Sequence, residues 1–554
     1  MNVTAPAASS TPARTLSRPP IGYWTGDANA LVVGPDGLVQ AARRSNELVY
    51  IVATAHGPAA AFGGEAHLGR GGMNGAGSYP LHAVLPPISA ETLGDESFCR
   101  AHGVRYPYMT GAMANGIGSA DIVIAMGKAG LMGSFGAAGL SHQRIEQAID
   151  RIQGELGNLP YCFNLIHTPN EPSIEQGTVD LYLRRGVHLI EAAAFLGLTP
   201  MLVQYRLSGL RRGADGFVVA ANRVIAKISR AEVAQAFMKP APEKMVQELL
   251  AAGKITAQEA ELGREISVAD DITVEADSGG HTDNRPLVGL LPLIINLRDR
   301  LGTRGTGGHP VRVGAAGGIA TPASTAAAFS MGAAYVVTGS VNQAALESGL
   351  AAKGKVLLAQ AEMTDVMMAP AADMFEMGVK VQVLKRGTMF AMRGQKLYEI
   401  YRQYESLEAI PVKERERLEQ QLFRRSVDEV WAETQSYWQK MDPRQLTRAA
   451  ENPKHKMALC FRWYLGLASR WAIQGDETRA VDFQIWCGPA MGAFNDWARG
   501  GPLEKPENRN VVNIARNLLE GAAVLQRAES LRAQGIPVPD ETFQYPSRVF
   551  GPAA

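Results

Sequence analysis

The chain has 554 residues, which is too long for one simple domain and indicates two or three structural units. Hydrophobic residues make up 46% of the chain and charged residues 20%, so it can build a large core and is not disordered overall. The formal net charge is +1, which gives no reason to expect nucleic acid or an anionic membrane as a partner.

Neither a signal peptide nor a membrane span is expected. Residues 1–20 are rich in Ala, Ser, Thr and Pro without an apolar core, which predicts a flexible tail. The best apolar run, residues 286–297, is too short to span a membrane and contains Pro292. The four cysteines lie far apart without metal or redox spacing. These features predict a soluble, cytoplasmic protein with reduced thiols.

Residues 21–100 predict a small N-terminal unit with β-structure and a glycine-rich connection. Strands are expected at residues 30–33 and 48–53, around a turn at Pro35-Asp36-Gly37. Residues 57–77 are rich in glycine but lack the spacing of a phosphate-binding P-loop. We interpret this stretch as a mobile linker or lid, with a nucleotide-binding loop as the alternative.

Residues 101–345 alternate between short strands, small-residue turns and helices. The expected strands cover residues 106–109, 130–135, 161–166, 188–194, 223–228, 272–274, 311–313 and 335–338. Eight such units predict an α/β protein with a (β/α)8 TIM barrel, and an open doubly wound sheet is the structural rival. Residues 240–266 predict a helical insertion, and residues 201–205 and 217–221 an inserted hairpin. Residues 346–554 predict a mostly helical C-terminal region.

Glycines follow two consecutive predicted strands, the seventh and the eighth. Exposed backbone N–H groups at such strand ends bind anions, and this position of a barrel commonly holds a ligand phosphate. We therefore predict phosphate contacts at Gly317, Gly318, Gly339 and Ser340. The alternative is that these glycines only form tight turns.

His281 follows two glycines at the end of the sixth predicted strand. A histidine at this rim of a barrel suits proton transfer near neutral pH, which makes His281 the candidate catalytic residue. A structural histidine remains an alternative. A metal site with Asp277 and Asp283 is weaker because no second histidine has supportive spacing. A nucleophile at Ser278 is weaker still, because no strand–elbow–helix frame surrounds it.

Several of these motifs together resemble known families. Residues 106–342 resemble the FMN-binding barrel of the nitronate monooxygenase and flavin-dependent enoyl-ACP reductase superfamily. The motifs are Gly111-Ala-Met-Ala114, Asn164, Asp277-Ser-Gly-Gly-His281, Ala315-Ala-Gly-Gly-Ile319 and Thr338-Gly-Ser340. Nearly the whole chain resembles the PfaD family, the discrete, trans-acting enoyl reductases of polyunsaturated fatty acid and polyketide synthases. The motifs here are Ala226-Lys-Ile-Ser-Arg-Ala-Glu-Val233, Lys239-Pro-Ala-Pro242 and Glu275-Ala-Asp-Ser-Gly-Gly-His-Thr-Asp-Asn284.

The resemblance implies an enoyl reductase in which NADPH or NADH reduces FMN, and reduced FMN reduces a trans-2-enoyl thioester on an acyl carrier protein. It implies Ala112 and Met113 against the flavin ring, with Asn164 and Lys227 at its polar edge. Gly280 would join the four predicted phosphate contacts. His281 would donate the proton or align the thioester carbonyl. The superfamily also implies a homodimer, and its frequent glutamate at position 277 is an aspartate here, which leaves the role of that acid open.

Two rival functions and two secondary features complete the prediction. The rivals are a nitronate monooxygenase that uses oxygen and a non-catalytic synthase component. A basic loop is the predicted docking surface for an acidic carrier protein, with an ordinary solvated turn as the alternative; its cations are Lys385, Arg386, Arg393 and Lys396. The methionines of residues 363–377 suit either an acyl tunnel or plain core packing.

Overall fold

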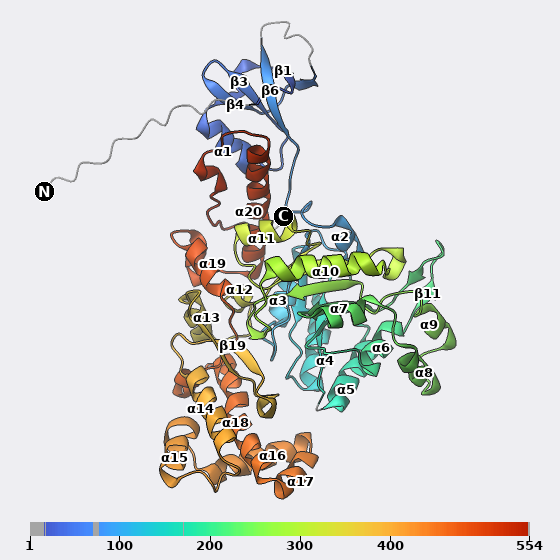
Figure 1. Cartoon of the computed structure of the whole chain (residues 1–554), viewed down its shortest axis with the longest axis vertical. Coiled ribbons are helices and arrows are strands. Elements are labelled where there is room, and N and C mark those ends of the chain that lie inside the picture. Colours follow the sequence, from blue (N-terminus) through green and yellow to red (C-terminus); the bar gives the residue numbers. More distant parts are fainter. Residues whose placement is uncertain (1–15, 17, 70–76, 170, 552–554) are drawn as a thin grey trace, which may run out of the picture.

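The computed structural model describes residues 16, 18–69, 77–169 and 171–551. The N-terminal unit lies at one end of the molecule, a barrel lies in the middle, and C-terminal helices pack beside the barrel and below it (Figure 1). Most of the predicted tail, residues 1–15 and 17, lies outside the described residues, as does part of the predicted linker, residues 70–76. No helix in the described ranges is long and apolar enough to cross a membrane.

Six antiparallel strands form the sheet of the N-terminal unit within the described residues, in the order β2-β4-β3-β6-β1-β5. They are β1 (Gly22–Thr25), β2 (Leu31–Val33), β3 (Val49–Thr54), β4 (Gly57–Ala61), β5 (Glu65–Leu68) and β6 (Ser78–Leu85). The two predicted strands are present as β2 and β3. Residues 57–61 and 65–68, predicted as linker, instead form strands.

The turn predicted at Pro35 is wrong, because Pro35 begins the helix α1 (Pro35–Arg43). Proline suits the first helical position, where its missing N–H has no partner to lose. Leu38, Ala41 and Ala42 then bury one face of α1 against the sheet. A Pro-Asp-Gly sequence can start a turn or a helix, and only the buried apolar face of the residues that follow distinguishes a helix from a turn.

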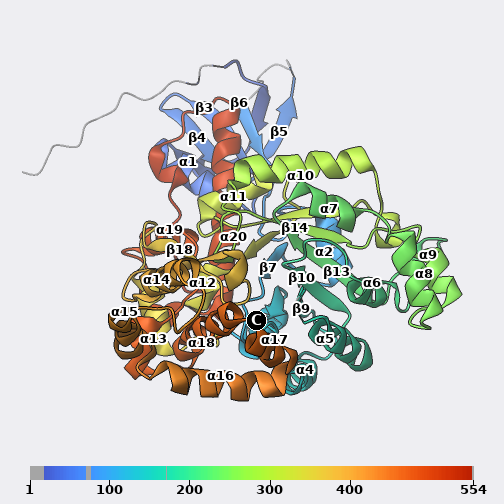
Figure 2. The same cartoon turned by 60° about the horizontal axis from the view of Figure 1, so that its bottom comes forward.

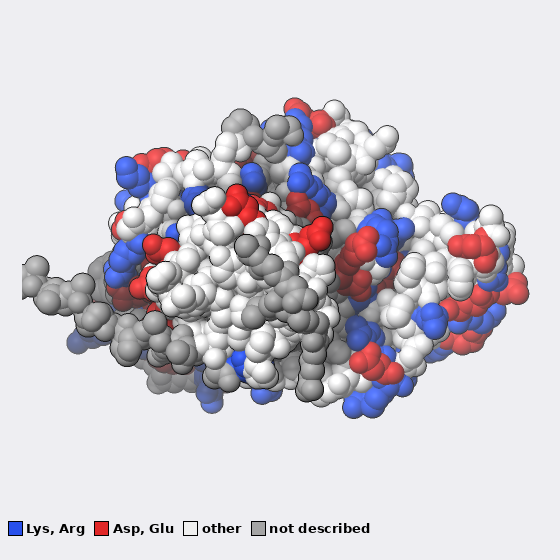
Figure 3. Space-filling model, turned by 90° about the horizontal axis from the view of Figure 1, so that it is seen from above, with Lys and Arg blue, Asp and Glu red and all other residues white. Residues whose placement is uncertain are grey.

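The outer face of the N-terminal unit carries few charged side chains, as Figure 3 shows from that end of the molecule. Several of its large apolar side chains are exposed, among them Ile21, Val33, Leu48 and Leu68.

Eight parallel strands close a barrel within the described residues, in the order β10-β13-β14-β16-β17-β7-β8-β9. They are β7 (Tyr108–Thr110), β8 (Met132–Phe135), β9 (Cys162–Ile166), β10 (Leu189–Ala193), β13 (Arg223–Ile228), β14 (Asp271–Glu275), β16 (Arg312–Ala316) and β17 (Val336–Thr338). Each overlaps one of the eight predicted strands, so the predicted TIM barrel is confirmed. The open doubly wound sheet is excluded because the two ends of this strand order, β10 and β9, also pair, so the sheet has no edge strand in the part of the chain that the structure describes.

Helices surround the barrel. They are α2 (Glu96–His102), α3 (Ala120–Lys128), α4 (His142–Leu156), α5 (Pro172–Arg185), α6 (Pro200–Leu207), α7 (Ala231–Met238), α10 (Leu287–Leu301), α11 (Pro322–Ser330) and α12 (Ser340–Gln343). The predicted helical insertion is present as α8 (Glu243–Ala251) and α9 (Ala257–Leu262).

The strand predicted at residues 201–205 is wrong, because these residues belong to α6. Thr199 caps this helix by accepting the N–H of Leu202, and Pro200 occupies its first turn. A short, fully buried apolar run has the same pattern in a strand and in a helix, so the cap is the distinguishing signal. The hairpin itself is small and pairs β11 (Arg211–Arg212) with β12 (Val218–Val219).

The C-terminal region is mostly helical, as predicted. Its helices are α13 (Ala352–Ala359), α14 (Phe390–Gln403), α15 (Val412–Arg417), α16 (Val427–Met441), α17 (Arg444–Glu451), α18 (Pro453–Gln474), α19 (Ala490–Ala498) and α20 (Val511–Ala533). It also holds two strands that were not predicted, β18 (Val366–Pro370) and β19 (Lys380–Leu384). α16 and α17 lie below α4 and α5 in Figure 1, and Figure 2 shows them with this end of the molecule turned forward.

The last long helix, α20, connects the N-terminal unit to the barrel (Figure 1). One part of it shares a buried cluster with α1 and β3, through Val524, Ala528 and Leu531. Another part packs on α11 so closely that a Cβ at Gly521 would lie 2.6 Å from the Pro322 side chain.

Candidate active site

The mouth of the barrel holds a buried group of charges centred on Glu191. The Glu191 side chain, on β10, is 1% exposed, and its Oε2 accepts the backbone N–H of Ala112 at 2.7 Å. Lys227, on β13, places Nζ 3.8 Å from Oε1 of Glu191 and 3.2 Å from Oε1 of Glu275. Asn164, on β9, donates from Nδ2 to the Glu191 carbonyl at 3.1 Å. The structure thus brings together three of the predicted site residues, Ala112, Asn164 and Lys227.

Lys227 is held in its charged form by this environment. Burial lowers the pKa of Lys227, but Glu275 and Glu191 outweigh that effect and raise the pKa well above its ordinary value. Two carboxylates face one ammonium group, so negative charge is in excess. Oε1 of Glu191 makes no hydrogen bond within the described residues. The group can therefore accept a further hydrogen bond from a ligand.

Glu191 and Glu275 are absent from the residues predicted from the sequence. Glu191 stands inside an otherwise apolar strand, Leu189–Ala193, all of which is buried. Ionisable residues are rarely buried without a partner, so an acid within such a strand is itself a signal for a functional or paired site.

Met113 lies in the turn that follows β7. Its backbone carbonyl accepts the N–H of Gly118 at 2.9 Å. A Cβ at Gly136 would lie 1.7 Å from this carbonyl oxygen, so the end of β8 has room only for glycine there. This close packing fixes the turn that carries Ala112 and Met113.

Two of the predicted phosphate contacts face open space at neighbouring strand ends. A Cβ added at Gly318 or at Gly339 would meet no atom within 4 Å. Gly317 has a structural role, since its φ is +84° and a Cβ there would lie 2.6 Å from the carbonyl carbon of Ala276. Ser340 Oγ accepts the N–H of Gly488 at 3.0 Å, which leaves the hydroxyl hydrogen free to donate.

His281 is held by a small sheet. Gly280 and His281 form β15, which pairs antiparallel with β19 so that His281 faces Val381. Its Nε2 lies 3.3 Å from Oδ1 of Asp373. Burial lowers the pKa of His281, but Asp373, helped by Glu275, outweighs burial and raises it above the ordinary value. His281 therefore keeps its proton to higher pH than a free histidine does.

The acids beside His281 hold the loop in place. Asp277 Oδ1 accepts from Nε2 of Gln382 at 2.8 Å and from Nδ2 of Asn284 at 2.9 Å. Asp283 pairs with Arg230 at 3.0 Å. The two carboxylates thus have separate partners, and no group of three or more His, Cys, Asp or Glu that could hold a metal occurs in the described residues. In this structure Asp277 therefore stabilises the loop through its hydrogen bonds with Gln382 and Asn284.

A C-terminal segment, residues 486–488, forms one wall of the site and was not predicted. A Cβ at Gly279 would lie 2.8 Å from the Cys487 backbone nitrogen, so the two segments pack this closely only because residue 279 is glycine. A Cβ at Gly280 would lie 3.8 Å from the Trp486 ring. No sequence periodicity relates segments this far apart along the chain.

The predicted basic docking loop is largely neutralised. Arg386 pairs with Asp365 and Glu362, and Arg393 pairs with the buried Asp482. Lys396 pairs with Glu414 at 2.7 Å, which leaves Lys385 without an ion pair in the described ranges. The region is also ordered as the end of β19 and the start of α14. These contacts favour the alternative of an ordinary surface over a docking site.

Comparisons with known proteins agree with this architecture. Residues 404–483 match the family described as acyl-carrier-protein S-malonyltransferase, inserted helical domain. A polyunsaturated fatty acid synthase subunit of Thraustochytrium is 51% identical over 458 residues, which are 81% of this chain and 30% of that protein. The polyketide biosynthesis protein PksE of Bacillus subtilis is 46% identical over 81% of this chain and 58% of its own length.

A solved structure matches as well. The enoyl reductase domain of MlnA, from the macrolactin biosynthesis cluster of Bacillus amyloliquefaciens, superposes with a TM-score of 0.74 at 40% identity. The match covers 80% of this chain and 98% of that domain.

Fold and site together define a (β/α)8-barrel protein with a charged, glycine-lined mouth that is walled by a C-terminal helical region. The chain belongs to the family of enoyl reductases of polyunsaturated fatty acid and polyketide synthases, the PfaD family whose motifs it carries. It spans 30% and 58% of the two curated relatives.

Proposed function

We propose that this chain is an FMN-dependent enoyl reductase that acts on trans-2-enoyl thioesters of an acyl carrier protein. The match to nearly the whole enoyl reductase domain of MlnA, at 40% identity, is the observation that carries the proposal. Similarity to named proteins of polyunsaturated fatty acid and polyketide synthesis supports a carrier-bound acyl substrate. Action in trans and a homodimer are part of the same proposal.

The residues at the barrel mouth fit FMN. Glu191 Oε1 and Thr110 Oγ1 are buried polar atoms without a hydrogen-bond partner in the described ranges, and they suit the polar edge of an isoalloxazine. The open strand ends at Gly318 and Gly339 suit a phosphate. FMN carries both features at opposite ends.

We assign the binding residues accordingly. The backbone of Ala112 and Met113 would contact the ring, and Asn164 and Lys227 would bind its polar edge. The phosphate would bind among Gly280, Gly317, Gly318, Gly339 and Ser340. A bound flavin supplies hydride transfer from NADPH or NADH to the β-carbon of the enoyl thioester.

His281 completes the reaction in this proposal. Reduction of an enoyl group needs one hydride at the β-carbon and one proton at the α-carbon. Asp373 keeps His281 protonated to higher pH, so the imidazolium can deliver that proton or donate a hydrogen bond to the thioester carbonyl.

A single absorbance experiment tests the reaction type. The purified protein, loaded with FMN, is expected to lose its flavin absorbance when NADPH is added without oxygen. Addition of a crotonyl thioester should restore that absorbance with formation of butyryl thioester. Turnover of a nitronate with oxygen and without nicotinamide would indicate a monooxygenase instead. Failure to take up FMN would indicate a non-catalytic synthase component.

A further inference from the structure

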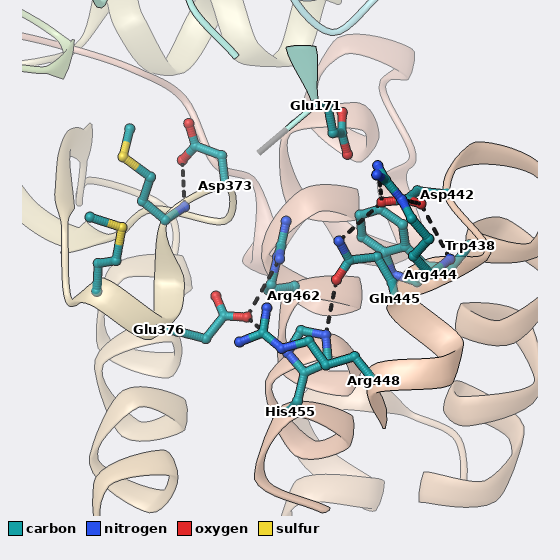
Figure 4. A pocket seen from close by; sticks show the side chains of 12 residues that line it. Glu171, Asp373, Glu376, Trp438, Asp442, Arg444, Gln445, Arg448, His455 and Arg462 are labelled. Atoms are coloured by element: carbon teal, nitrogen blue, oxygen red, sulfur yellow. Dashed lines mark hydrogen bonds and ion pairs between the residues drawn. The ribbon is translucent and has the colours of Figure 1, made fainter. Parts of the chain in front are cut away.

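A cavity of about 420 Å³ lies between the barrel and the C-terminal helices (Figure 4). On the barrel side the cavity is lined by Glu171, which lies between β9 and α5. Asp373, in the connection between β18 and β19, lines another part of the wall. The remaining wall comes from α16, α17 and α18 and the turn between α16 and α17. Asp373, which lines the cavity, also lies 3.3 Å from His281, the residue proposed to act on the substrate.

Cationic side chains line the wall that α17 and α18 provide. Arg444 pairs with Asp442 at 2.8 Å, and Arg462 lies 3.6 Å from Glu376. Arg448 lines the same cavity and forms no ion pair or side-chain hydrogen bond in the described part of the chain. Figure 4 shows Arg444 on the opposite side of the cavity from Asp373, and the Arg448 side chain extending from α17 toward Glu376 and His455. An anionic group entering from the α17 side would therefore find an unpaired guanidinium.

A buried hydrogen-bond acceptor lies between these two sides. His455 is 3% exposed, and its Nε2 lies 2.9 Å from Oε1 of Gln445. Since that amide oxygen can only accept, Nε2 carries the hydrogen and Nδ1 of the neutral ring is an acceptor. Burial, with Arg448 and Arg462, lowers the pKa of His455 and keeps the ring neutral. Nδ1 has no hydrogen-bond partner within the described residues and lies 3.6 Å from a carboxylate oxygen of Glu376.

We infer that this cavity binds the phosphopantetheine arm of the substrate, with the phosphate at Arg448 and the thioester end toward Asp373 and His281. The arm has one phosphate and two amides, and the cavity is lined by the Arg448 guanidinium and by two acceptors, His455 and Glu171. This inference rests on the proposed function. The cavity volume is near the lower limit for ligand sites, which favours an arm with one phosphate over a dinucleotide.

Calorimetry tests the site without turnover. Phosphopantetheine and dephosphorylated pantetheine are titrated into the full-length wild type and into the Arg448→Ala, Arg448→Lys and Arg402→Ala variants. Arg402 is the control, because it is an exposed arginine on α14 that does not line the cavity. We expect the phosphate to strengthen wild-type binding about tenfold, as a charge-assisted hydrogen bond does. Arg448→Ala should abolish that gain, Arg448→Lys should keep part of it, and Arg402→Ala should keep all of it.

Kinetics with crotonyl-phosphopantetheine, crotonyl-pantetheine and NADPH separates this inference from the proposed function. We expect Arg448→Ala to raise only the KM for crotonyl-phosphopantetheine, at unchanged kcat. Equal wild-type binding of both pantetheines, or an increase in the KM for NADPH instead, would overturn the assigned occupant. Arg448-dependent binding of phosphopantetheine by a protein that reduces no enoyl thioester would support the site and refute the proposed function.

Discussion

Nε2 of His281 lies 3.3 Å from Oδ1 of Asp373, and this contact joins the mouth of the barrel to the C-terminal region. The backbone makes the same connection, because β15 at Gly280–His281 pairs with β19. The orientation of the candidate catalytic residue is therefore set by residues outside the barrel. Asp373 also lines the cavity that we assign to the substrate arm, so the same carboxylate lies beside His281 and in the cavity wall.

Replacing Asp373 with asparagine should move the pH dependence of enoyl reduction toward acid. Burial lowers the pKa of His281 and Asp373 raises it, with the raising effect in excess. Without the carboxylate, His281 loses its proton at lower pH, so the limb of kcat/KM that falls with rising pH shifts to lower pH. NMR titration of the His281 ring checks the same shift without turnover. If neither the pH dependence of kcat/KM nor the NMR titration of the ring changed, Asp373 would not control the protonation of His281.

Removing the imidazole should affect only the second half of the reaction. A proton donor typically contributes 10²–10⁴-fold to a rate, so we expect His281→Ala to slow enoyl reduction at least about a hundredfold. Bleaching of bound flavin by NADPH should keep its rate, which stopped-flow absorbance measures separately. His281→Gln, which retains a hydrogen-bond donor, should recover part of the rate if alignment of the carbonyl matters. Full enoyl reduction by His281→Ala with FMN bound would refute the assignment.

Lys227 should matter for stability as well as for the cofactor. Lys227→Met leaves Glu191 buried opposite no cation, and breaking a buried ion pair from one side typically costs about 3–5 kcal/mol. Urea unfolding of the apoprotein measures the loss. The double variant Lys227→Met/Glu191→Gln should regain much of it, because only the partly exposed Glu275 then lacks its cation and the fully buried charge is gone. Equal stability of the single and double variants would mean that the pair is not coupled.

The eight barrel strands could be predicted because each is a short β-branched or apolar run that stops at small residues, a pattern that local sequence contains. The predicted phosphate contacts rest on the same strand ends, two of which, Gly318 and Gly339, face open space. Short apolar runs fit a strand or a helix equally well, which explains the error at α6; its Thr199-Pro200 start was the informative signal. The helix α1 shows the same limit, because its proline fits a turn as well as a first helical residue.

The site could be predicted only in part, because chain topology and not local pattern assembles the rest of it. Ala112, Asn164 and Lys227 follow from family motifs that lie on the barrel strands. Asp373 and Trp486 reach the site from the C-terminal region, and no sequence motif around either residue indicates a role in the site. The strand β15 has only two residues, Gly280 and His281, which are too few to give a strand pattern in the sequence, so its pairing with β19 could not be predicted.

Two neighbouring glycines should respond differently to alanine. Gly339 has a φ of −123° and open space at its Cβ position, so Gly339→Ala should leave the apoprotein as stable as the wild type. A methyl group there would enter the space assigned to the FMN phosphate, and fluorescence titration should show at least about tenfold weaker FMN binding, as loss of one charge-assisted hydrogen bond would give. Gly317→Ala should instead destabilise the apoprotein, because its φ is positive and its Cβ would collide with the backbone at Ala276. Unchanged FMN affinity in Gly339→Ala would place the phosphate elsewhere.

Arg527 should hold the N-terminal unit to the rest of the protein. This arginine on α20 is fully buried, and its guanidinium donates to the backbone carbonyls of Ala41, Arg44, Glu47 and Pro86. Burial lowers its pKa to about 10, so it remains charged at neutral pH.

Arg527→Met would leave those carbonyls buried without donors, at a cost of about 1–3 kcal/mol for each one that water cannot reach. We expect rapid proteolysis within residues 18–85 while the barrel stays resistant. Arg532→Met, on the exposed side of the same helix, removes a surface pair with Glu529 and a cation–π contact with Phe543, and should cost only about 1 kcal/mol. If both variants resisted proteolysis equally, the apolar contacts of α20 with α1 would be sufficient to hold the unit, and the guanidinium would not be needed for attachment.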